Sequence, residues 1–558
     1  MLLEFKDGFI YVYDGYEYKE HLKLLGFWWN SEQKRWERFY DDVVVQHLKR
    51  FNPYIVNHIK KQADQTLVEE LRQMYPFAME HQLVGTALAI QNKSFLIGDE
   101  PGVGKTLQAI MYIDYLLAKG AISHGIIFCP SSIKRQWRDE FYKFLKVSPF
   151  IVEGDRQLRR LIFTQALRKT SYPVLILNYE LLLREDVFNF LSSLESYALV
   201  FDEASRFKNK DSKTFKLVQA LANKTEYKLA LTGTPVENHL AEFWAVGFIL
   251  KGFMDYKEFE EKHLIVQKVQ YANTAFPVKK IIGYKNLRSF LFRIGEFYIR
   301  RKKSDIKELP ALTEYVRFIE LAPLQKQMEE YLKERIASAK GLNLESIITL
   351  LRVINDDPRL LLASQSEIAQ AIVERFKHEI ERFKANPKLD ELQSIVEEHE
   401  GKKILVFTSF AKVAQLIANE FKALMITGST DEKTRAKIIW EFKKRDSNIL
   451  VSTDALTYGV SLDEADIVVH FDIPWSVGKI VQRTERIYRI TTSRNKWVYF
   501  FVGSGIESKV WEILQKKRTL FNQVVEGDVV DEEVKALSRT QLKSSDELLQ
   551  MLSNLSTC

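Results

Sequence analysis

Short apolar runs alternate with helical stretches in two separate parts of the chain. The first series begins near residue 76 and contains SFLIGDE, GIIFCP, VLILNYE, YALVFDE and YKLALTGTP. The second begins near residue 402 and contains KKILVFTSF, ALMITGS, NILVSTD, IVVHFD and WVYFFV. Strands that are separated by helices predict parallel sheets covered by helices on both faces. We therefore predict an α/β fold with two doubly wound parallel-sheet lobes.

The first 70 residues follow another pattern. The segment FKDGFIYVYDGYEY alternates apolar and polar residues around glycines, which predicts a β-hairpin. EYKEHLKLLGFWW predicts a short helix closed by Gly26, and KRWERFY predicts a further strand. The predicted organisation is a small α+β module at 1–70, a first lobe at 75–250, a mainly helical insertion at 251–395, a second lobe at 396–527 and a polar tail at 528–558.

Size and composition exclude several classes of protein. A chain of 558 residues is too long for one hydrophobic core, and 46% apolar with 28% charged residues excludes a mostly disordered or fibrous chain. Cys129 and Cys558 can form neither a disulfide framework nor a CxxC zinc site, which favours a reducing compartment. No run approaches roughly 18 apolar residues, and the N-terminus lacks a signal-peptide pattern, so we expect a soluble intracellular protein without a membrane span. The net charge of +7 is compatible with a polyanionic partner.

The segment LIGDEPGVGKTLQAI has the context of a nucleotide-phosphate loop, because an apolar strand runs through glycines into a helix. Gly102 and Gly104 allow backbone amides to turn toward a polyphosphate, and the following helix adds the positive end of its dipole. We expect Lys105 to reach the β- and γ-phosphates and the Thr106 hydroxyl to bind Mg²⁺. Asp99 stands where the first glycine of a strict G-x-x-x-x-G-K-[ST] pattern belongs.

The segment YALVFDEAS ends an apolar strand in two acids. In a parallel sheet this places Asp202 and Glu203 at the carboxyl edge, where ligands bind in such folds. We expect Asp202 to hold Mg²⁺ through water and Glu203 to polarise the attacking water. The alternative for such a pair is a helix cap, and it is the strand–acid pairing after the lysine loop that favours the catalytic role.

These segments resemble the motifs of a known family. GDEPGVGKT, DEAS and LTGTPVENHLAEFW resemble motifs I, II and III of superfamily-two helicases of the Swi/Snf type. The similarity continues through FYIRRKKSDIKELP, KILVFTSF, STDALTYGVSL and QRTERIYRI, so that it covers roughly residues 75–525. The resemblance implies two RecA-like lobes and a DNA-dependent ATPase that uses ATP and Mg²⁺. A phage or bacterial source is compatible with it.

The resemblance also implies roles for single residues. It makes Gln82 the residue that reads the adenine ring, and it makes Thr232, Gly233 and Thr234 the motif that couples the nucleotide site to DNA. Arg486 and Arg489 would reach the γ-phosphate from the second lobe, where a guanidinium stabilises the transferred phosphoryl group; the alternative is a pair of solvated surface arginines. The implied nucleotide-binding residues are Gln82, Gly102, Val103, Gly104, Lys105 and Thr106, the metal ligands Thr106 and Asp202, and the catalytic residues Lys105, Asp202, Glu203, Arg486 and Arg489.

Several positions depart from the family pattern. The acid motif ends in Ser205 in place of histidine, which we expect to alter coupling to DNA rather than hydrolysis. Leu456 and Thr457, followed by Gly459, replace a frequent Gly-Gly pair. In the last motif, Glu485 stands before Arg486, and Thr491-Thr492 replace Gly-Gln.

DNA contacts in such a motor would be mostly to phosphates, and therefore independent of sequence and sensitive to salt. For each candidate the alternative is a capping or solvated residue, and the basic run Arg300–Lys303 could brace phosphates or face solvent. The candidates are Ser131, Trp137, Arg138, Tyr179, Arg206 and Lys208 in the first lobe and Ser409, Ser452 and Thr453 in the second.

The N-terminal segment GYEYKEHLKLLGFWWNSEQKRWERFYDD resembles the HARP domain of annealing helicases. This resemblance implies an accessory DNA-binding module in which Trp28, Trp29 and Trp36 stack on bases at a junction of single and double strands. The same tryptophans could instead form the core of a small sheet. Acids nearly balance bases in this segment, which argues against a purely electrostatic DNA clamp.

Taken together, the sequence predicts an ATP-driven DNA translocase or helicase that remodels branched DNA, such as replication forks and recombination junctions, by branch migration or strand annealing. Conventional strand-separating helicases and motors that displace transcription complexes remain alternatives, whereas intact Lys105, Asp202, Glu203 and Arg489 argue against a scaffold that only binds DNA. Replication or recombination proteins are the expected partners. The expected location is the cytoplasm of a bacterial or phage-infected cell, or the nucleus of a eukaryote.

Overall fold

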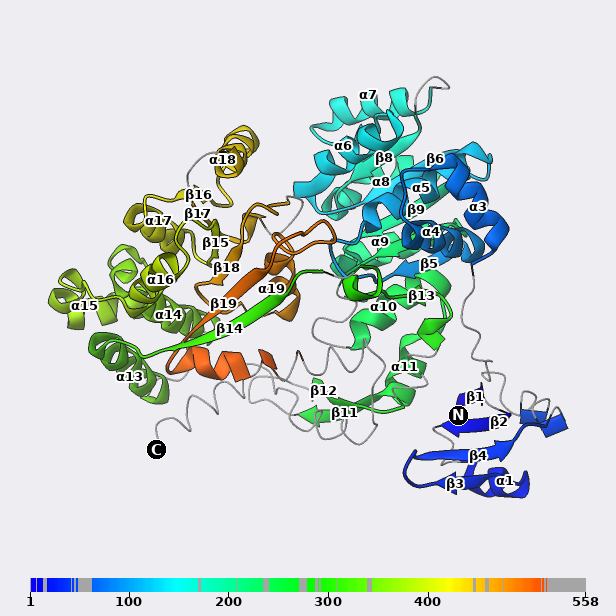
Figure 1. Cartoon of the computed structure of the whole chain (residues 1–558), viewed down its shortest axis with the longest axis horizontal. Helices are drawn as coiled ribbons and strands as arrows, with labels where there is room; N and C mark the ends of the chain where they lie inside the picture. Colours follow the sequence, from blue (N-terminus) through cyan, green and yellow to red (C-terminus); the bar gives the residue numbers. More distant parts are fainter. Residues whose placement is uncertain are drawn as a thin grey trace. The chain divides into compact units, whose positions relative to one another are not determined.

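The computed structural model (Figure 1) describes most of the chain. Contacts divide it into two compact units, of which the first includes the residues up to Glu100 and Gly104–Arg301 and the second includes Lys302–Arg518. Lys208, Thr234, Thr457, Gly459 and the predicted tail 528–558 lie outside the described residues. The described residues are 2–518 except 7, 14–17, 42, 45–46, 49–62, 169–171, 208, 234–239, 270–277, 287–289, 291–292, 308, 339–343, 445–447, 457–460, 475, 513 and 516–517.

The described part of the N-terminal module contains an antiparallel sheet and a short helix, as predicted. Its elements are β1 (Leu2–Lys6), β2 (Phe9–Tyr13), α1 (Lys19–Leu24), β3 (Trp28–Asn30) and β4 (Arg35–Phe39). The strand order is β1-β2-β4-β3. Gly26 follows α1 with φ of 77°, the left-handed conformation that closes a helix most easily at glycine. A small core forms from Leu3, Ile10, Val12, Leu22, Phe27, Trp36, Val44 and Leu48.

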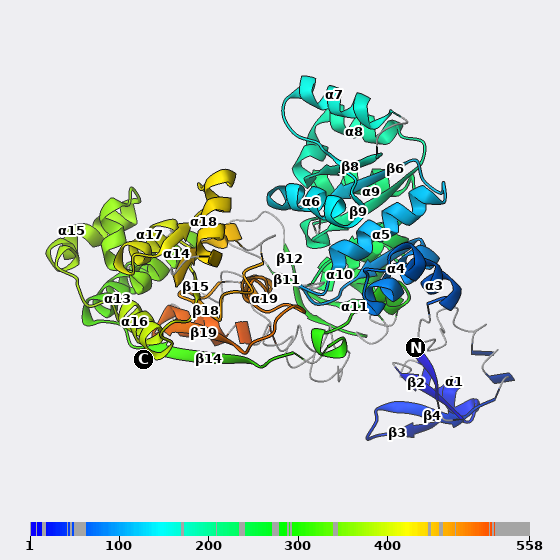
Figure 2. The ribbon, with the colours of Figure 1, turned by 45° about the horizontal axis from the view of Figure 1, so that its top comes forward.

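The first lobe, lobe 1, is built around a parallel sheet of seven strands in the order β13-β5-β10-β9-β6-β8-β7. Helix α5 packs against β6, α6 packs against β7 and β8, and α10 packs against β5 and β10 (Figure 2). The elements are α3 (Gln65–Met74), α4 (Glu80–Asn92), β5 (Ser94–Ile97), α5 (Lys105–Ala118), β6 (His124–Phe128), α6 (Lys134–Leu145), β7 (Phe150–Ile151), α7 (Arg156–Ala166), β8 (Val174–Leu177), α8 (Glu185–Ser193), β9 (Tyr197–Asp202), α9 (Lys213–Ala222), β10 (Lys228–Leu231), α10 (Leu240–Lys251), α11 (Tyr256–His263), β11 (Leu264–Val269), β12 (Val278–Tyr284) and β13 (Tyr298–Ile299).

The second lobe, lobe 2, has a parallel sheet of six strands in the order β14-β19-β18-β15-β17-β16. Its elements are β14 (Leu312–Ile319), α13 (Pro323–Ser338), α14 (Leu344–Asp356), α15 (Glu367–Glu381), α16 (Pro387–Glu398), β15 (Ile404–Phe407), α17 (Ala411–Glu420), β16 (Leu424–Ile426), α18 (Glu432–Lys444), β17 (Ile449–Ser452), β18 (Ile467–His470), α19 (Val477–Thr484) and β19 (Lys496–Gly503).

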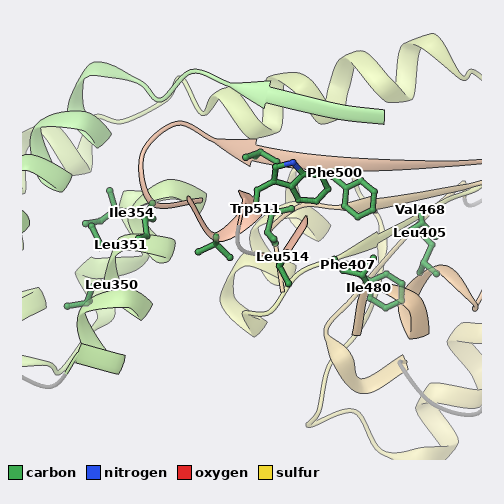
Figure 3. Close-up of a cluster of buried hydrophobic side chains, with 14 of the residues drawn as sticks. Leu350, Leu351, Ile354, Leu405, Phe407, Val468, Ile480, Phe500, Trp511 and Leu514 are labelled. Carbon is green, nitrogen blue, oxygen red and sulfur yellow. The ribbon is translucent and has the colours of Figure 1, made fainter. Parts of the chain in front are cut away.

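Both faces of the lobe 2 sheet are buried, because alternate strand residues belong to different core clusters. Leu405, Val468 and Phe500 pack in a cluster with α14, whose Leu351 and neighbouring apolar side chains appear in Figure 3. The intervening residues, such as Val406, Val469 and Phe501, pack in a second cluster with α16 and α17. Successive side chains of a strand point to opposite faces, so strands covered on both sides must be apolar throughout. This explains the continuous apolar runs in the sequence and confirms the predicted fold class.

The stretch 251–395 contains several helices, as predicted, and also strands that belong to the sheets of the two lobes. Its residues include β13, which joins the lobe 1 sheet beside β5, and β14, which joins the lobe 2 sheet beside β19. Strand β14 lies at an edge, and most of its side chains are partly or fully exposed. An edge strand of this kind mixes polar and apolar residues, so its sequence LTEYVRFI does not produce the apolar run that marks a central strand. Within the described residues, no helix is both long and apolar enough to cross a membrane.

A buried cluster of three charged residues, Lys388, Asp356 and Glu507, connects different parts of lobe 2. The Lys388 ammonium is fully buried and donates to Asp356 Oδ1 at 2.7 Å and to Glu507 Oε1 at 2.9 Å. These carboxylates come from the end of α14 and from the segment after β19, so one side chain joins three parts of the lobe.

Lys388→Met should therefore lower the free energy of unfolding by about 3–5 kcal/mol, because it leaves two buried carboxylates without their cation. The shift of the urea transition measures this loss. Lys326→Met is the control, since Lys326 pairs with Glu320 at the surface, where an ion pair contributes at most about 1 kcal/mol. Equal stability of the two variants would contradict the assigned role of the cluster.

Candidate functional site

The loop between β5 and α5 has the backbone of a phosphate-binding turn. Gly102 and Gly104 adopt φ of 84° and 88°, which side chains other than glycine rarely tolerate. Gly104 is also the N-cap residue of α5, so the first amides of that helix follow the turn directly. A Cβ on Gly104 would lie 2.1 Å from Gln82 Nε2, which places Gln82 against the loop. Both predicted glycines are therefore required by the geometry.

The side chains around this loop are partly buried and already engaged. Lys105 Nζ donates to the carbonyl oxygens of Asp99 at 2.7 Å and Glu100 at 3.1 Å. Gln82 is 7% exposed, and its Oε1 accepts the backbone N–H of Met79 at 2.9 Å. Thr106 lies in the first turn of α5, next to Lys105. The structure thus gathers the predicted nucleotide-binding residues of lobe 1 at one helix N-terminus.

The register of three neighbouring strands brings the acid pair to the same edge of the sheet. Leu231 pairs with Ile97 on one side and with Asp202 on the other. The segments after β5, β9 and β10 therefore start side by side, because parallel strands share one carboxyl edge. Thr232 and Gly233 follow β10 at this edge, and the Thr232 N–H donates to the Ile97 carbonyl oxygen at 3.2 Å.

Asp202 is held by two aromatic side chains. Its Oδ2 accepts the Trp137 indole N–H at 2.8 Å, and its backbone oxygen accepts the Tyr179 hydroxyl at 2.8 Å. Burial raises the pKa of Asp202, while the Trp137 hydrogen bond and the positive charge of Lys105 act in the opposite direction. The carboxylate is thus oriented by one side chain and stabilised in its charged form by another.

Glu203 has an unusual backbone conformation. Its φ is 52°, in the left-handed region that a residue with a long side chain seldom adopts. Such conformations cost on the order of 1–3 kcal/mol and occur preferentially at functional sites. The strain falls on the residue that the sequence predicts to polarise water, directly after the buried strand β9.

Two predicted DNA contacts in lobe 1 have a different place in the structure. Trp137 is 1% exposed and Tyr179 is 3% exposed, and both donate to Asp202. A buried ring has no surface to offer to DNA, so we remove these residues from the DNA-contact set and assign them to positioning Asp202. The aromatic residue type did not reveal this in the sequence. Ser131 and Arg206 are exposed and Arg138 is half-buried, as DNA contacts require.

The basic run Arg300–Lys303 is not the solvent-facing stretch that was one of the two alternatives predicted for it. Arg300 donates to the carbonyl oxygens of Gly98 at 2.9 Å and Gly233 at 3.2 Å. Arg301 forms an ion pair with Asp99. In the second unit, Lys303 is 3% exposed and forms an ion pair with Glu485. The run therefore binds groups of the protein and is not a solvated basic face.

The two predicted arginines of lobe 2 follow α19 and do not lie on it. Arg486 is 8% exposed, and its Nε donates to the carbonyl oxygen of Gln482 at 3.1 Å. Arg489 is half-buried, and its Nε donates to the carbonyl oxygen of Glu485 at 3.1 Å. Neither is a freely solvated surface side chain. Their reach toward a phosphate remains a proposal.

The predicted DNA contacts of lobe 2, like those of lobe 1, include both buried and accessible residues. Ser452 is fully buried and Thr453 is half-buried. Ser409 is partly exposed, and its hydroxyl donates to Asp472 Oδ1 at 2.5 Å and accepts from Arg352 at 3.0 Å. The Arg352 guanidinium and further hydrogen bonds hold the pKa of the buried Asp472 at about 2, against the effect of burial.

Sequence reasoning missed Asp472 and Arg352. Asp472 stands two residues after the end of β18 in IVVHFD, so the signal that identified Asp202, an acid at the end of an apolar strand, was also present here. Arg352 lies on α14 and is 6% exposed, and no local pattern distinguishes it from a surface arginine.

The three tryptophans of the N-terminal module separate between core and surface. Trp36 is 4% exposed and belongs to the module core. Trp28 and Trp29 are 43% and 45% exposed. The predicted base-stacking role thus stays open for Trp28 and Trp29, whereas Trp36 has the structural role that was its alternative.

Two family models match the chain. The SNF2-related domain matches residues 23–360, which is more than half of the chain, and the helicase conserved C-terminal domain matches residues 387–491. The chain belongs to the SNF2-related family. This agrees with the Swi/Snf resemblance of the motifs, whereas neither model match distinguishes an annealing-helicase branch.

Relatives of this SNF2-related chain are distant in sequence. The probable ATP-dependent DNA helicase CHR12 of Arabidopsis thaliana is 25% identical over 527 residues, covering 89% of this chain and 46% of the relative. The ISWI chromatin-remodeling complex ATPase ISW2 of Saccharomyces cerevisiae is 29% identical over 486 residues, covering 83% of this chain and 41% of the relative. The chain thus spans less than half the length of these curated relatives.

Among solved structures, the Sulfolobus solfataricus SWI2/SNF2 ATPase core in complex with dsDNA is 26% identical to this SNF2-related chain. The match covers 84% of this chain and 95% of that one, with a TM-score of 0.36.

Trp137→Phe should shift the acidic limb of the pH–activity profile to higher pH. The indole N–H stabilises the Asp202 carboxylate and lowers its pKa. Without this hydrogen bond the pKa rises, so a higher pH is needed to ionise the carboxyl group for the catalytic role that the sequence predicts. The profile of kcat/KM against pH measures the shift. Trp440→Phe, at an exposed tryptophan, is the control. A Trp137→Phe profile that is lower at every pH but not displaced would contradict the role of this hydrogen bond.

Proposed function

We propose that this protein is an ATP-driven, Mg²⁺-dependent DNA translocase. The observation that carries the proposal is the joint placement of the glycine turn, Lys105, Asp202 and Glu203 at one carboxyl edge of the lobe 1 sheet. Membership of the SNF2-related family and the match of lobe 2 to the helicase C-terminal domain support it.

The residues at this edge fit a nucleotide with magnesium. The turn at Gly102 and Gly104 presents backbone N–H groups and the N-terminus of α5, which favour a polyphosphate. A hydroxyl from Thr106 and a carboxylate from Asp202 are hard oxygen donors of the kind that Mg²⁺ prefers, and Mg²⁺ usually completes its shell with water and phosphate oxygens. Among the residues that the structure describes, no group of three or more His, Cys, Asp or Glu side chains could bind a metal by itself.

In this function each residue has a definite task. Bound Mg²⁺ would neutralise charge that develops on the phosphates. Lys105 would exchange its bonds to the loop carbonyls for bonds to the β- and γ-phosphates, Gln82 would read the adenine and Glu203 would orient and polarise water. Arg486 and Arg489 would stabilise the transferred phosphoryl group from lobe 2.

DNA binding would rest on the candidates that the structure leaves accessible. In lobe 1 these are Ser131, Arg138 and Arg206. In lobe 2, Ser409 is oriented by Asp472 and Arg352. Thr453, the residue after β17, is half-buried. Contacts of this kind address the phosphate backbone, so binding should be independent of sequence and should weaken with salt.

The action on branched DNA is the finer part of the proposal, and an exposed aromatic sheet face supports it. Phe9 pairs with Phe39, and Glu37 pairs with both Tyr11 and Trp28, so these side chains share one face of the module. The rings contact one another, with centroids of Phe9 and Phe39 4.6 Å apart and those of Trp28 and Phe39 5.7 Å apart. The opposite face carries the core residues Ile10, Val12 and Trp36.

This aromatic face, defined by Phe9, Tyr11, Trp28 and Phe39, suits unpaired bases better than duplex phosphates. Phe39 is 66% exposed, and rings on a sheet offer flat surfaces on which bases stack. Arg35 lies 3.8 Å from the Tyr11 ring centroid and is paired with Glu37, so the face adds little net charge. A module that binds unpaired bases would direct the motor to junctions of single and double strands, as the HARP-like interpretation requires.

DNA-dependent hydrolysis tests the motor itself. Duplex DNA should stimulate ATP turnover by the full chain, and the stimulation should weaken as salt rises. Lys105→Ala and Glu203→Gln should abolish turnover, and Glu203→Gln should still bind ATP, because the loop and Lys105 are unchanged. Hydrolysis that is indifferent to DNA would contradict the motor. Stimulation by single strands alone would favour a conventional strand-separating helicase over fork remodelling.

The aromatic face has its own test in the full chain. Trp28→Ala and Phe39→Ala should each weaken binding to a fork with a single-stranded arm about 10-fold, since one base–aromatic stack contributes about 1–3 kcal/mol. Affinity for blunt duplex and duplex-stimulated hydrolysis should stay unchanged. Leu24→Ala is the matched control, because Leu24 lies on α1 of the same module and is 86% exposed. Unchanged fork affinity in both aromatic variants would contradict a junction-reading role of this face.

A further inference from the structure

Two sequence features have no role in the function proposed above: the acid at the first position of the phosphate loop and the basic run after β13. The structure joins them. Arg301 Nε and the Arg301 backbone N–H each donate to Asp99 Oδ1 at 3.0 Å, and Arg301 Nη2 donates to Asp99 Oδ2. The Asp99 side chain is fully buried and the Arg301 side chain is 13% exposed. This is a bidentate pair in a largely dry site, the strong form of an Arg–carboxylate contact.

The guanidinium of Arg301 lies in a site built from two helices. Its Nη2 also donates to Gln108 Oε1 on α5 at 2.9 Å, and its Nη1 donates to the carbonyl oxygen of His81 on α4. Gln108 Nε2 in turn donates to Asp99 Oδ2 at 3.1 Å. A Cβ on Gly85, in the middle of α4, would lie 2.7 Å from Arg301 Nη2. Glycine weakens a helix interior, and here it provides the space that the Gln108 amide and the Arg301 guanidinium occupy.

The backbone beside Arg301 follows the start of the phosphate loop. The N–H groups of Gly98 and Glu100 donate to the carbonyl oxygens of Ile299 and Arg301 at 2.8 and 3.0 Å. The pairing of β13 with β5 therefore continues into the loop. Arg300 adds a hydrogen bond to the Gly98 carbonyl oxygen at 2.9 Å.

Asp99 causes no backbone strain at the position where a strict phosphate loop has glycine. Within this loop, the described residues with positive φ are Gly102 and Gly104. A side chain is thus sterically allowed at position 99, and its carboxylate connects the loop to Arg301.

We propose that Arg301 is a positioning residue for nucleotide binding: through Asp99 it holds the phosphate loop in the shape that receives the polyphosphate. The inference rests on the proposed ATP-binding role of that loop. It adds that the loop depends on a side chain about 200 residues away, at the last residue of the first unit before the chain continues into the second. Lys105 donates to the carbonyl oxygen of Asp99. A displaced loop would therefore displace Lys105 as well, and would lower the affinity for ATP and the rate of hydrolysis.

Arg301→Gln in the full chain tests the proposal. It should lower kcat/KM for ATP about 10- to 100-fold, since displacements of about 1 Å in a binding loop have effects of this size. The separate values of KM and kcat, and the ATP-induced rise in melting temperature, show whether nucleotide binding is affected. The double variant Asp99→Asn with Arg301→Gln should be no worse than Arg301→Gln alone, because the two residues act as one unit.

Arg159 provides a matched control for the loss of a buried ion pair. Arg159 Nε and Nη2 donate to Asp186 at 2.8 and 3.0 Å, and its Nη1 donates to the carbonyl oxygen of Gly154 at 2.6 Å, in the same lobe but on α7 and α8. Arg159→Gln should lower the melting temperature while leaving kcat/KM for ATP within about twofold of wild type.

Each outcome decides between the explanations. If Arg301→Gln is destabilised like Arg159→Gln and keeps kcat/KM within about twofold of wild type, Arg301 has a structural role only and the proposal is overturned. If Arg301→Gln does not fold, Asp99→Asn, which preserves the volume of the side chain, replaces it under the same criterion. If the wild-type protein itself hydrolyses no ATP with DNA, the proposed motor function fails, and the ATP-induced shift in melting temperature still shows whether Arg301 positions the loop.

Discussion

The common direction of the strands in lobe 1 is the constraint on which the candidate site depends. Parallel strands end at one edge of the sheet, and the register of β5, β10 and β9 aligns Ile97, Leu231 and Asp202. The glycine turn, the Thr232 segment and the acid pair therefore begin side by side, although about 100 residues or more separate the glycine turn from the other two. Long side chains are not needed to bring these residues together, because the backbone already places them at the same edge of the sheet.

Buried ion pairs keep these loop segments in place in both lobes. Arg301 binds Asp99 beneath the phosphate loop, Arg352 binds Asp472 beside Ser409, and Lys388 joins two carboxylates at the base of lobe 2. Removing charges from water is costly, so a buried pair is retained only where its geometry is well satisfied. The first two of these ion pairs contact segments that the proposed function assigns to nucleotide or DNA binding. Buried ion pairs thus fix the backbone at the sites that, in the proposed function, bind a highly charged ligand.

Aromatic residues show how little residue type says about role in this chain. Trp137 and Tyr179 are buried and orient Asp202, whereas Trp28 and Phe39 are exposed on a sheet face. In the sequence, Trp137 (KRQWRDE) and Phe39 (WERFYDD) stand in equally polar surroundings, yet the first is buried and the second is exposed. Burial depends on which helix covers which strand, and that depends on residues far away in the chain.

The sequence by itself determined the two parallel sheets, the N-terminal hairpin and the positions of Gly102, Gly104, Lys105, Asp202 and Glu203. It could do so because strands buried on both faces must be continuously apolar, and because a tight anion-binding turn requires glycine at positive φ; both are local requirements. Only the tertiary structure decided that β13 and β14 complete the sheets, that Arg301 pairs with Asp99, that Trp137 serves Asp202 and that Trp36 is core while Trp28 is not. Edge strands need no apolar run, and a buried ion pair between distant residues has the same local sequence as a solvated one, so these features depend on contacts that no short segment encodes.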